Sequence, residues 1–379
     1  MHICFIANEF PLPDISYGGI GTFLVSYSKI LIEYGHSVSI VGTVNSKKDI
    51  IEKKNGVEIF YFQQSKIKGL KWFFNSKKLS KKISIIHKNK PIDVIEAQEA
   101  GFAFIKTPIG IRKIIRMHGG HSFFAEFEGK KINFWKFFQE KKSFKKCDAV
   151  IATSEFVKTQ TLKHINFEKK PQTVINNPIL IDLFSPQDKS KIIFGSAVFA
   201  GTICEKKGIR QLCLAIPKII EEFPEFHLYA YGRDWFFPDG RLYKDWLLDQ
   251  LSESILRHVT FLKPVIYEEL PNVYAKGEIC IFPSHVEVQG LVAPEAMSMQ
   301  KPVIFTKFGP GPETIDDEIN GWLCDTKSSD NIADTVIKVF KMRKNFESIG
   351  KLARKKVINK FEPKIIYNQN ISFYESIIK

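Results

Sequence analysis

The chain has 379 residues, of which 44% are hydrophobic and 25% are charged. This length predicts two domains with a core each, and the composition excludes a disordered or fibrous chain. No apolar run approaches the roughly 20 residues that span a bilayer, and Met1 leads straight into a strand without a basic or long apolar leader, so we expect a cytoplasmic protein.

The net charge of +14 lies almost wholly in the first half of the chain. Residues 1–185 hold 29 Lys and Arg against 16 Asp and Glu, whereas the remaining residues hold 26 against 25. A basic face on one domain indicates an anionic partner. Nucleic acid and an anionic membrane surface are both candidates at this point.

The six cysteines are scattered, without a Cys-x-x-Cys pair, and several fall inside apolar strands. We therefore expect reduced thiols in the cores. No Asp-x-Asp occurs, and no His, Cys and Asp cluster has the spacing of metal ligands, so no metal is expected.

The chain begins with a βαβ pattern. Residues 2–7 predict a strand, residues 17–21 a glycine loop, residues 22–34 a helix and residues 37–41 a second strand. The loop is not Gly-x-Gly-x-x-Gly, so the nicotinamide fingerprint is absent. A plain tight turn is the alternative reading of this loop.

Three further strands are predicted at residues 57–62, 92–95 and 113–117. The third delivers His118 at its carboxyl end, where open α/β sheets bind ligands. His118 is therefore the better site candidate, and His121, three residues later, is its rival. A hydrogen-bonded structural loop histidine is the plainer alternative.

Two segments mix lysine with aromatic residues, at residues 66–90 and 130–146. The first is predicted to be helical between residues 67 and 88 and carries Trp72-Phe73-Phe74. Basic, aromatic helices lie on anionic membrane surfaces. The alternative is that the aromatic residues belong to the core and that the lysines are merely solvated.

Residues 173–184 are predicted to cross between domains, and residues 185–190 form a polar linker. The second domain then alternates strands and helices. A strand at residues 192–200 leads through the loop 201–208, which contains Thr202 and Lys207, into a helix at residues 209–223. The later elements are expected as strands at 226–231, 259–262, 278–282 and 303–305, and as helices at 329–360 and 364–378.

The stretch 279–305 carries the strongest chemical signal. Glu287 follows a buried strand, Glu295 lies about one turn into the next helix, and Gly290-Leu291-Val292 presents free N–H groups where that helix begins. Carboxylates beside such donors suit a ligand that carries both hydroxyls and phosphate. That both carboxylates merely cap a helix is the alternative.

The spacing of Glu287 and Glu295 around this helix start resembles the Glu-x7-Glu motif of retaining GT-B glycosyltransferases, in particular glycosyltransferase family 4. The resemblance implies an α/β fold of two Rossmann-like domains with parallel sheets that face an interdomain cleft. Residues 1–185 would bind the acceptor and residues 186–363 the nucleotide sugar, while a C-terminal helix, 364–379, would pack back on the first domain.

The resemblance also assigns the donor contacts. Glu287 would contact the sugar hydroxyls, Glu295 the ribose and the amides of Gly290, Leu291 and Val292 the diphosphate. His118 would lie beside the transferred sugar.

The two remaining loops match the family less closely. Gly18 and Gly19 are the positions where the backbone would approach the donor phosphates and the acceptor. Lys207 matches the family's diphosphate lysine, but Thr202 stands where the family has an arginine, so one positive charge is missing. We expect Lys206 or the helix N-terminus to compensate for this missing charge.

The function implied is the transfer of a hexose-type sugar, with retention, from a UDP-sugar or GDP-sugar to a glycan or lipid-linked acceptor. Surface polysaccharide or lipopolysaccharide assembly at the inner face of the cytoplasmic membrane is the expected setting, without a cofactor. A GT-B sugar-nucleotide epimerase and a non-catalytic protein that binds nucleic acid or an anionic surface are the alternatives. We do not expect nucleic acid, because the aromatic residues do not alternate on strands as in a base-stacking platform.

Overall fold

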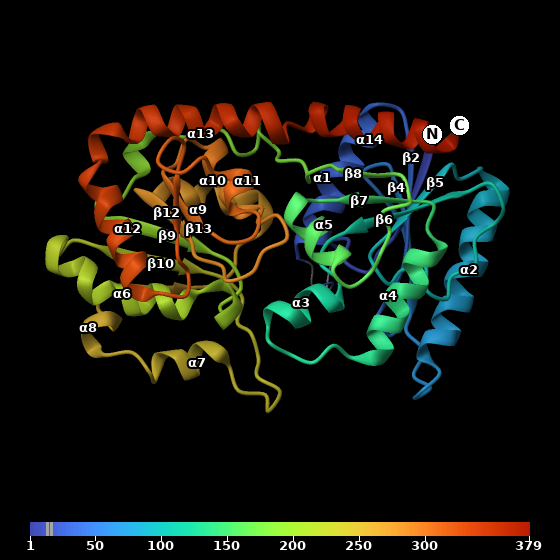
Figure 1. Cartoon of the computed structure of the whole chain (residues 1–379), viewed down its shortest axis with the longest axis horizontal. Helices are drawn as coiled ribbons and strands as arrows, with labels where there is room; N and C mark the ends of the chain where they lie inside the picture. Colours follow the sequence, from blue (N-terminus) through green and yellow to red (C-terminus); the bar gives the residue numbers. More distant parts are fainter. Residues whose placement is uncertain (13–14, 16–17) are drawn as a thin grey trace. The chain divides into compact units, whose positions relative to one another are not determined.

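The computed structural model describes residues 1–12, 15 and 18–379, which form two compact α/β units (Figure 1). Unit 1 contains Met1–Pro178 and Pro363–Lys379, and unit 2 contains Ile179–Glu362. The border thus lies seven residues before the expected one. Ile179 and Phe184 are buried in the core of unit 2, which explains the earlier border.

Unit 1 is built on an eight-stranded sheet with the order β3-β4-β2-β1-β5-β6-β7-β8. All neighbouring strands are parallel except β3 and β4, and this antiparallel edge strand was not predicted. The strands are β1 (His2–Ile6), β2 (Ser37–Val44), β3 (Ile50–Lys54), β4 (Val57–Gln63), β5 (Val94–Ala97), β6 (Arg112–Met117), β7 (Ala149–Ala152) and β8 (Gln172–Val174).

The helices of unit 1 pack their apolar stripes onto this sheet, as expected for a doubly wound domain. Ser154 caps the helix that begins at Glu155, because its side chain accepts a hydrogen bond from the N–H of Val157. The helices are α1 (Gly19–Glu33), α2 (Lys71–Asn89), α3 (His121–Phe127), α4 (Phe134–Lys146), α5 (Glu155–Leu162) and the C-terminal α14 (Pro363–Ile378).

A buried polar network attaches α14 to the rest of unit 1. The guanidinium of Arg116 binds both carboxylate oxygens of Glu96, at 2.8 and 2.9 Å, and it also donates to Asn370 of α14. Tyr374 of α14 donates to Glu96 at 2.5 Å. Breaking a buried pair of this kind by removing one partner typically costs about 3–5 kcal/mol, so the network holds α14 firmly to its sheet.

Unit 2 has a six-stranded, fully parallel sheet with the order β11-β10-β9-β12-β13-β14. This is the strand order of a Rossmann fold, and the order reverses between β9 and β12. The strands are β9 (Ser196–Ala200), β10 (His227–Tyr231), β11 (Val259–Leu262), β12 (Ile279–Phe282), β13 (Val303–Thr306) and β14 (Trp322–Cys324).

Helices cover both faces of this sheet, and their apolar residues form two buried clusters with the strands. The helices are α6 (Ile209–Glu222), α7 (Tyr243–Leu248), α8 (Glu253–Leu256), α9 (Leu270–Lys276), α10 (Val292–Ser298), α11 (Gly311–Thr314), α12 (Ser329–Lys341) and α13 (Phe346–Phe361).

Several element boundaries differ from those predicted, and the single helix expected at residues 329–360 is two helices, α12 and α13, separated by a short 3-10 turn at Arg343–Asn345. Helix α1 begins at Gly19 rather than at residue 22, so part of the expected glycine loop is helical, and Tyr17 lies outside the described residues. Strand β9 begins at Ser196 rather than at residue 192, because Gly195 adopts a positive φ of 72° in a turn. Helix α10 begins two residues later than expected.

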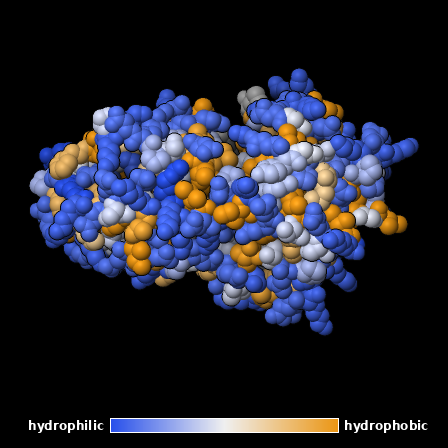
Figure 2. Space-filling view, turned by 90° about the horizontal axis from the view of Figure 1, so that it is seen from above, coloured by the Kyte–Doolittle hydropathy of each residue, from blue (hydrophilic) through white to orange (hydrophobic). Residues whose placement is uncertain are grey.

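The surface in Figure 2 is covered largely by hydrophilic residues, and its hydrophobic residues form small groups. Within the described part of the chain, no helix is long and apolar enough to cross a membrane. The six cysteines are free thiols, and all except Cys204 are buried, in agreement with the expectation of reduced core cysteines.

Candidate functional site

The loops that follow β9 and β12 pack closely against each other where the strand order of unit 2 reverses. A Cβ at Gly208 would lie 1.9 Å from the carbonyl oxygen of Pro283, so only glycine allows this approach. The N–H of His285 also donates to the carbonyl of Lys206 at 2.9 Å. Ligands of open α/β sheets bind at such a reversal of strand order, so these two loops are the candidate site.

An ion pair joins the two loops. Lys207 Nζ lies 2.5 Å from Glu287 Oε1, and the two side chains are 26% and 11% exposed. Burial would raise the pKa of Glu287, but the charge of Lys207 and hydrogen bonds from Lys207 and Ser284 outweigh it and hold the pKa below its usual range. Glu287 is therefore charged at neutral pH. Lys207 is thus held in an ion pair and is not a freely solvated surface lysine.

A second cation approaches the same loop from β10. The hydroxyl of Thr202 accepts a hydrogen bond of 3.4 Å from Nε of Arg233. The loop that carries Arg233 packs tightly on this one, because a Cβ at Gly232 would lie 1.7 Å from the carbonyl oxygen of Gly201. Sequence reasoning missed Arg233, since only the packing of β10 beside β9 brings a guanidinium to Thr202.

The turn before α10 also needs glycine. Gly290 has a φ of 74°, and a Cβ there would lie 2.6 Å from the ring of Phe305 and 3.2 Å from Cγ of Glu287. The N–H groups of Gly290, Leu291 and Val292 donate no hydrogen bond to any described residue. These donors therefore lie beside the Lys207–Glu287 pair.

Glu295 lies in the first turn of α10, as predicted, but its side chain is only 2% exposed. Tyr274 of α9 donates a hydrogen bond of 3.0 Å to it. Burial raises the pKa of Glu295 to about 7, although hydrogen bonds from Tyr274 and Tyr267 lower it in part. Glu295 is thus a buried carboxyl held by tyrosines, which the sequence pattern did not indicate.

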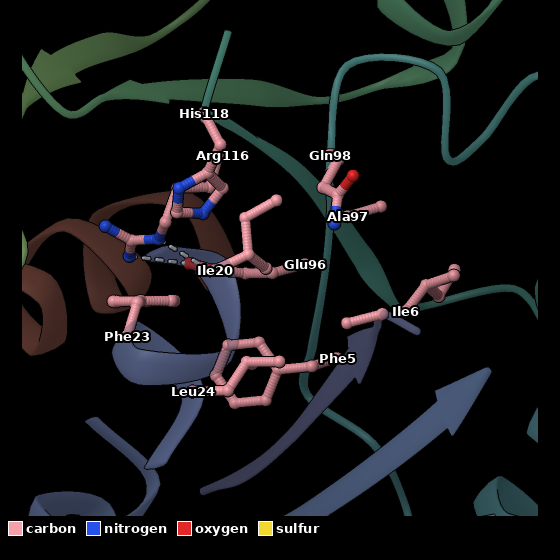
Figure 3. A pocket seen from close by; sticks show the side chains of 11 residues that line it. Phe5, Ile6, Ile20, Phe23, Leu24, Glu96, Ala97, Gln98, Arg116 and His118 are labelled. Atoms are coloured by element: carbon pink, nitrogen blue, oxygen red, sulfur yellow. Dashed lines mark hydrogen bonds and ion pairs between the residues drawn. The ribbon is translucent and has the colours of Figure 1, made fainter. Parts of the chain in front are cut away.

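In unit 1, His118 lies at the end of β6 beside a small cavity of about 20 Å³ (Figure 3). The ends of β1, β5 and β6 and the first turns of α1 form its walls. The imidazole packs against Phe23, with ring centres 5.3 Å apart. Burial, followed by the nearby charge of Arg116, lowers the pKa of His118 to about 3, so its ring is neutral at physiological pH.

His121 plays a structural part instead. It is the first residue of α3, and its Nε2 accepts a hydrogen bond of 2.8 Å from the N–H of Asn133. Its own N–H donates to Glu140, a buried carboxylate that also binds Ser122. Of the two histidines, only His118 lines the cavity, which favours it as the functional one.

The two candidate glycines open α1. The N–H of Gly18 donates to Glu9 at 3.0 Å, and Gly19 is the first residue of the helix. Among the described residues, a Cβ at Gly19 would meet no atom within 4 Å, a Cβ at Gly18 would lie 3.5 Å from Oε2 of Glu9, and neither residue has a positive φ. Packing among the described residues therefore does not require glycine at either position.

In the described ranges, no group of three or more His, Cys, Asp or Glu side chains is placed to hold a metal ion.

Comparison with known proteins identifies the chain. The family model described as Glycosyl transferases group 1 matches residues 187–356, and the one described as Glycosyltransferase Family 4 matches residues 17–183. The chain is a group 1, family 4-type glycosyltransferase. Both expectations drawn from the sequence, the GT-B fold and a transferase activity, are confirmed.

A glycosyltransferase of Methanocaldococcus jannaschii, MJ1607, is 27% identical to this glycosyltransferase over 99% of the chain and 98% of the relative. Among solved structures, sucrose-phosphate synthase from Thermosynechococcus elongatus has a TM-score of 0.81 at 19% identity and covers 99% of this chain and 98% of its own. Anabaena HepE, solved in complex with UDP, has a TM-score of 0.75 at 18% identity and covers 99% and 100%. The two structures share the fold.

Proposed function

We propose that this glycosyltransferase moves a hexose-type sugar from a nucleoside diphosphate donor to a glycan or lipid-linked acceptor, with retention at the anomeric carbon. The Lys207–Glu287 pair, which lies beside the free amides at Gly290–Val292, is the observation that supports a donor-binding site here. A diphosphate needs cations and N–H donors, and a sugar needs a hydroxyl acceptor. This cluster provides both.

The pair would exchange partners when the donor binds. Lys207 would turn from Glu287 to the diphosphate, and Glu287, which is charged at neutral pH, would accept hydrogen bonds from the sugar hydroxyls. Arg233 would supply the positive charge that Thr202 cannot. Glu295 would bind the ribose hydroxyls, and the open space at Gly19 would admit ligand atoms.

The low basicity of His118 fits retention. Burial and the charge of Arg116 lower its pKa to about 3, so we do not expect it to take the acceptor proton at neutral pH. The departing phosphate oxygen would take that proton, on the face that the donor occupied. His118 would hydrogen-bond the transferred sugar without changing its charge.

The basic, aromatic helices of unit 1 suit an acceptor held at an anionic membrane. Phe73 of α2 and Phe134, Trp135 and Phe138 of α4 are between 41% and 81% exposed, so they do not belong to the core. Each lysine near such a surface adds about 1 kcal/mol of attraction. The setting at the inner face of the cytoplasmic membrane, in surface polysaccharide or lipopolysaccharide assembly, stays a prediction.

Two experiments test the proposal. A thermal-shift panel of nucleoside diphosphates should show stabilisation by UDP or GDP. NMR of donor hydrolysis should show that the sugar formed first has the same anomeric configuration as the donor. UDP is the first choice because HepE, which shares the fold, was solved with it. No shift with any nucleotide, or an inverted product, would contradict the donor assignment or the retention.

Flotation with liposomes tests the membrane surface. We expect recovery with anionic vesicles to exceed recovery with neutral vesicles, and to fall at high salt. Equal recovery from both kinds of vesicle would overturn the membrane proposal while leaving the transferase proposal intact.

A further inference from the structure

Unit 1 contains a second, larger cavity of about 280 Å³ at the carboxyl ends of its strands. Its walls come from β1, β2, the loop after β5 and the helices α2 and α4. None of the described residues that line it carries a charge, although 25% of the chain is charged. The polar ones are Asn8, Thr43, Asn75, Ser76, Gln98 and Gln139.

This cavity adjoins the one beside His118, because Ile6, Ala7 and Gln98 line both. Figure 3 shows Gln98 and His118 on the ends of β5 and β6, which are neighbouring strands. A group bound in the larger cavity can therefore extend past Gln98 towards the imidazole.

The lining suits an uncharged sugar. Carboxamides and hydroxyls pair with sugar hydroxyls, and the aromatic side chains add an apolar wall. Trp72 and Phe104 form such a wall, with ring centres 4.2 Å apart. A phosphate or carboxylate in the same place would lose hydration without gaining a cation among the lining residues, which is costly.

The aromatic wall continues to the surface. Trp135 stacks on Phe104 with ring centres 5.7 Å apart, and Phe138 stacks on Trp135 at 5.6 Å. Lys142 lies over Phe104, with its Nζ 4.3 Å from the ring centre. A chain of rings thus leads from the cavity to exposed aromatic residues, with a cation at its edge.

We propose that this cavity binds the terminal sugar of the acceptor, that this sugar is uncharged, and that an apolar carrier attached to it runs along Phe104, Trp135 and Phe138. The inference rests on the proposed transferase function and names its acceptor class. The cation at Lys142 would meet a phosphate on the carrier outside the cavity.

Direct binding without donor tests this inference apart from the donor site. The probes are octyl β-glucoside below its micelle concentration, octyl β-glucuronide and methyl β-glucoside. Saturation-transfer NMR measures the binding of each probe. We expect octyl glucoside to bind, and octyl glucuronide to bind at least about fivefold more weakly. Gln98→Ala and Trp72→Ala should each weaken octyl glucoside at least about fivefold, while UDP binding stays unchanged.

Two variants separate the parts of the cavity. Gln139→Lys should reverse the preference in favour of the glucuronide, whereas the control Gln172→Lys on the edge strand β8 should not. Trp135→Ala should weaken octyl glucoside but leave methyl glucoside unaffected. Equal binding of both octyl glycosides, or binding untouched by the Gln98 and Trp72 variants, would overturn the inference. If the wild-type protein does not bind UDP, the donor proposal is refuted instead.

Discussion

Two substitutions of the Lys207–Glu287 pair should change nucleotide binding in opposite directions. In the free protein, Glu287 neutralises Lys207 before any diphosphate arrives. Glu287→Gln keeps the shape of the side chain but removes this competition, so UDP should bind more tightly. Lys207→Met removes the cation itself, so UDP should bind more weakly. Both variants should lose transfer activity, because the sugar or the leaving diphosphate loses its partner.

The structure sets the size of both effects. Two unit charges about 4 Å apart attract by about 4 kcal/mol at an effective dielectric of about 20. The side chains keep 26% and 11% exposure, which screens the pair, so we expect about 1–2 kcal/mol to be released in Glu287→Gln. That equals about 5- to 30-fold tighter UDP binding. Losing a hydrogen bond to a charged group in Lys207→Met should cost about 1.5–3 kcal/mol.

Isothermal titration with UDP at low salt measures both changes. Lys218→Met is the matched control, because Lys218 forms an ion pair of 2.6 Å with Asp334 whose members are 43% and 59% exposed. It should leave UDP affinity unchanged. If Glu287→Gln and Lys207→Met weakened UDP equally, the carboxylate would be holding the nucleotide, and the reasoning would be wrong.

Three further predictions concern single groups. Arg233→Ala should weaken UDP at least about fivefold in the same titration, and adding Thr202→Arg should restore it; failure of this rescue would remove Arg233 from the diphosphate site. Because burial raises the pKa of Glu295 to about 7, the folded state binds more protons than the unfolded state between pH 4.5 and 7, so stability falls as pH rises through that window. Glu295→Gln should therefore melt higher than wild type at pH 8 but bind UDP more weakly, and an unchanged melting curve would contradict the buried carboxylate. The imidazole signals of His118 should not titrate between pH 5 and 8 in NMR spectra, and a midpoint near 6.5 would contradict the neutral histidine.

Much of the fold could be read from local patterns. Apolar runs of strand length, each followed by a glycine or polar loop and a helical period, place β1, β6, β9 and β12 within a few residues. The edge strand β3 was missed because its residues, Ile50–Lys54, are mostly exposed and polar, and antiparallel pairing with β4 alone gives them their structure. The start of α1 was misplaced because glycines at a helix N-terminus look like a loop.

The sequence by itself determined which residues follow the strand ends, since alternation of strand and helix is a local property. It therefore indicated His118, Lys207, Glu287 and Glu295. Only the tertiary structure decided what each of them touches: Glu287 neutralises Lys207, tyrosines bury Glu295, and Arg233 reaches Thr202. The physical reason is the crossover order of the parallel sheet, which brings together loops that lie up to 80 residues apart in the chain.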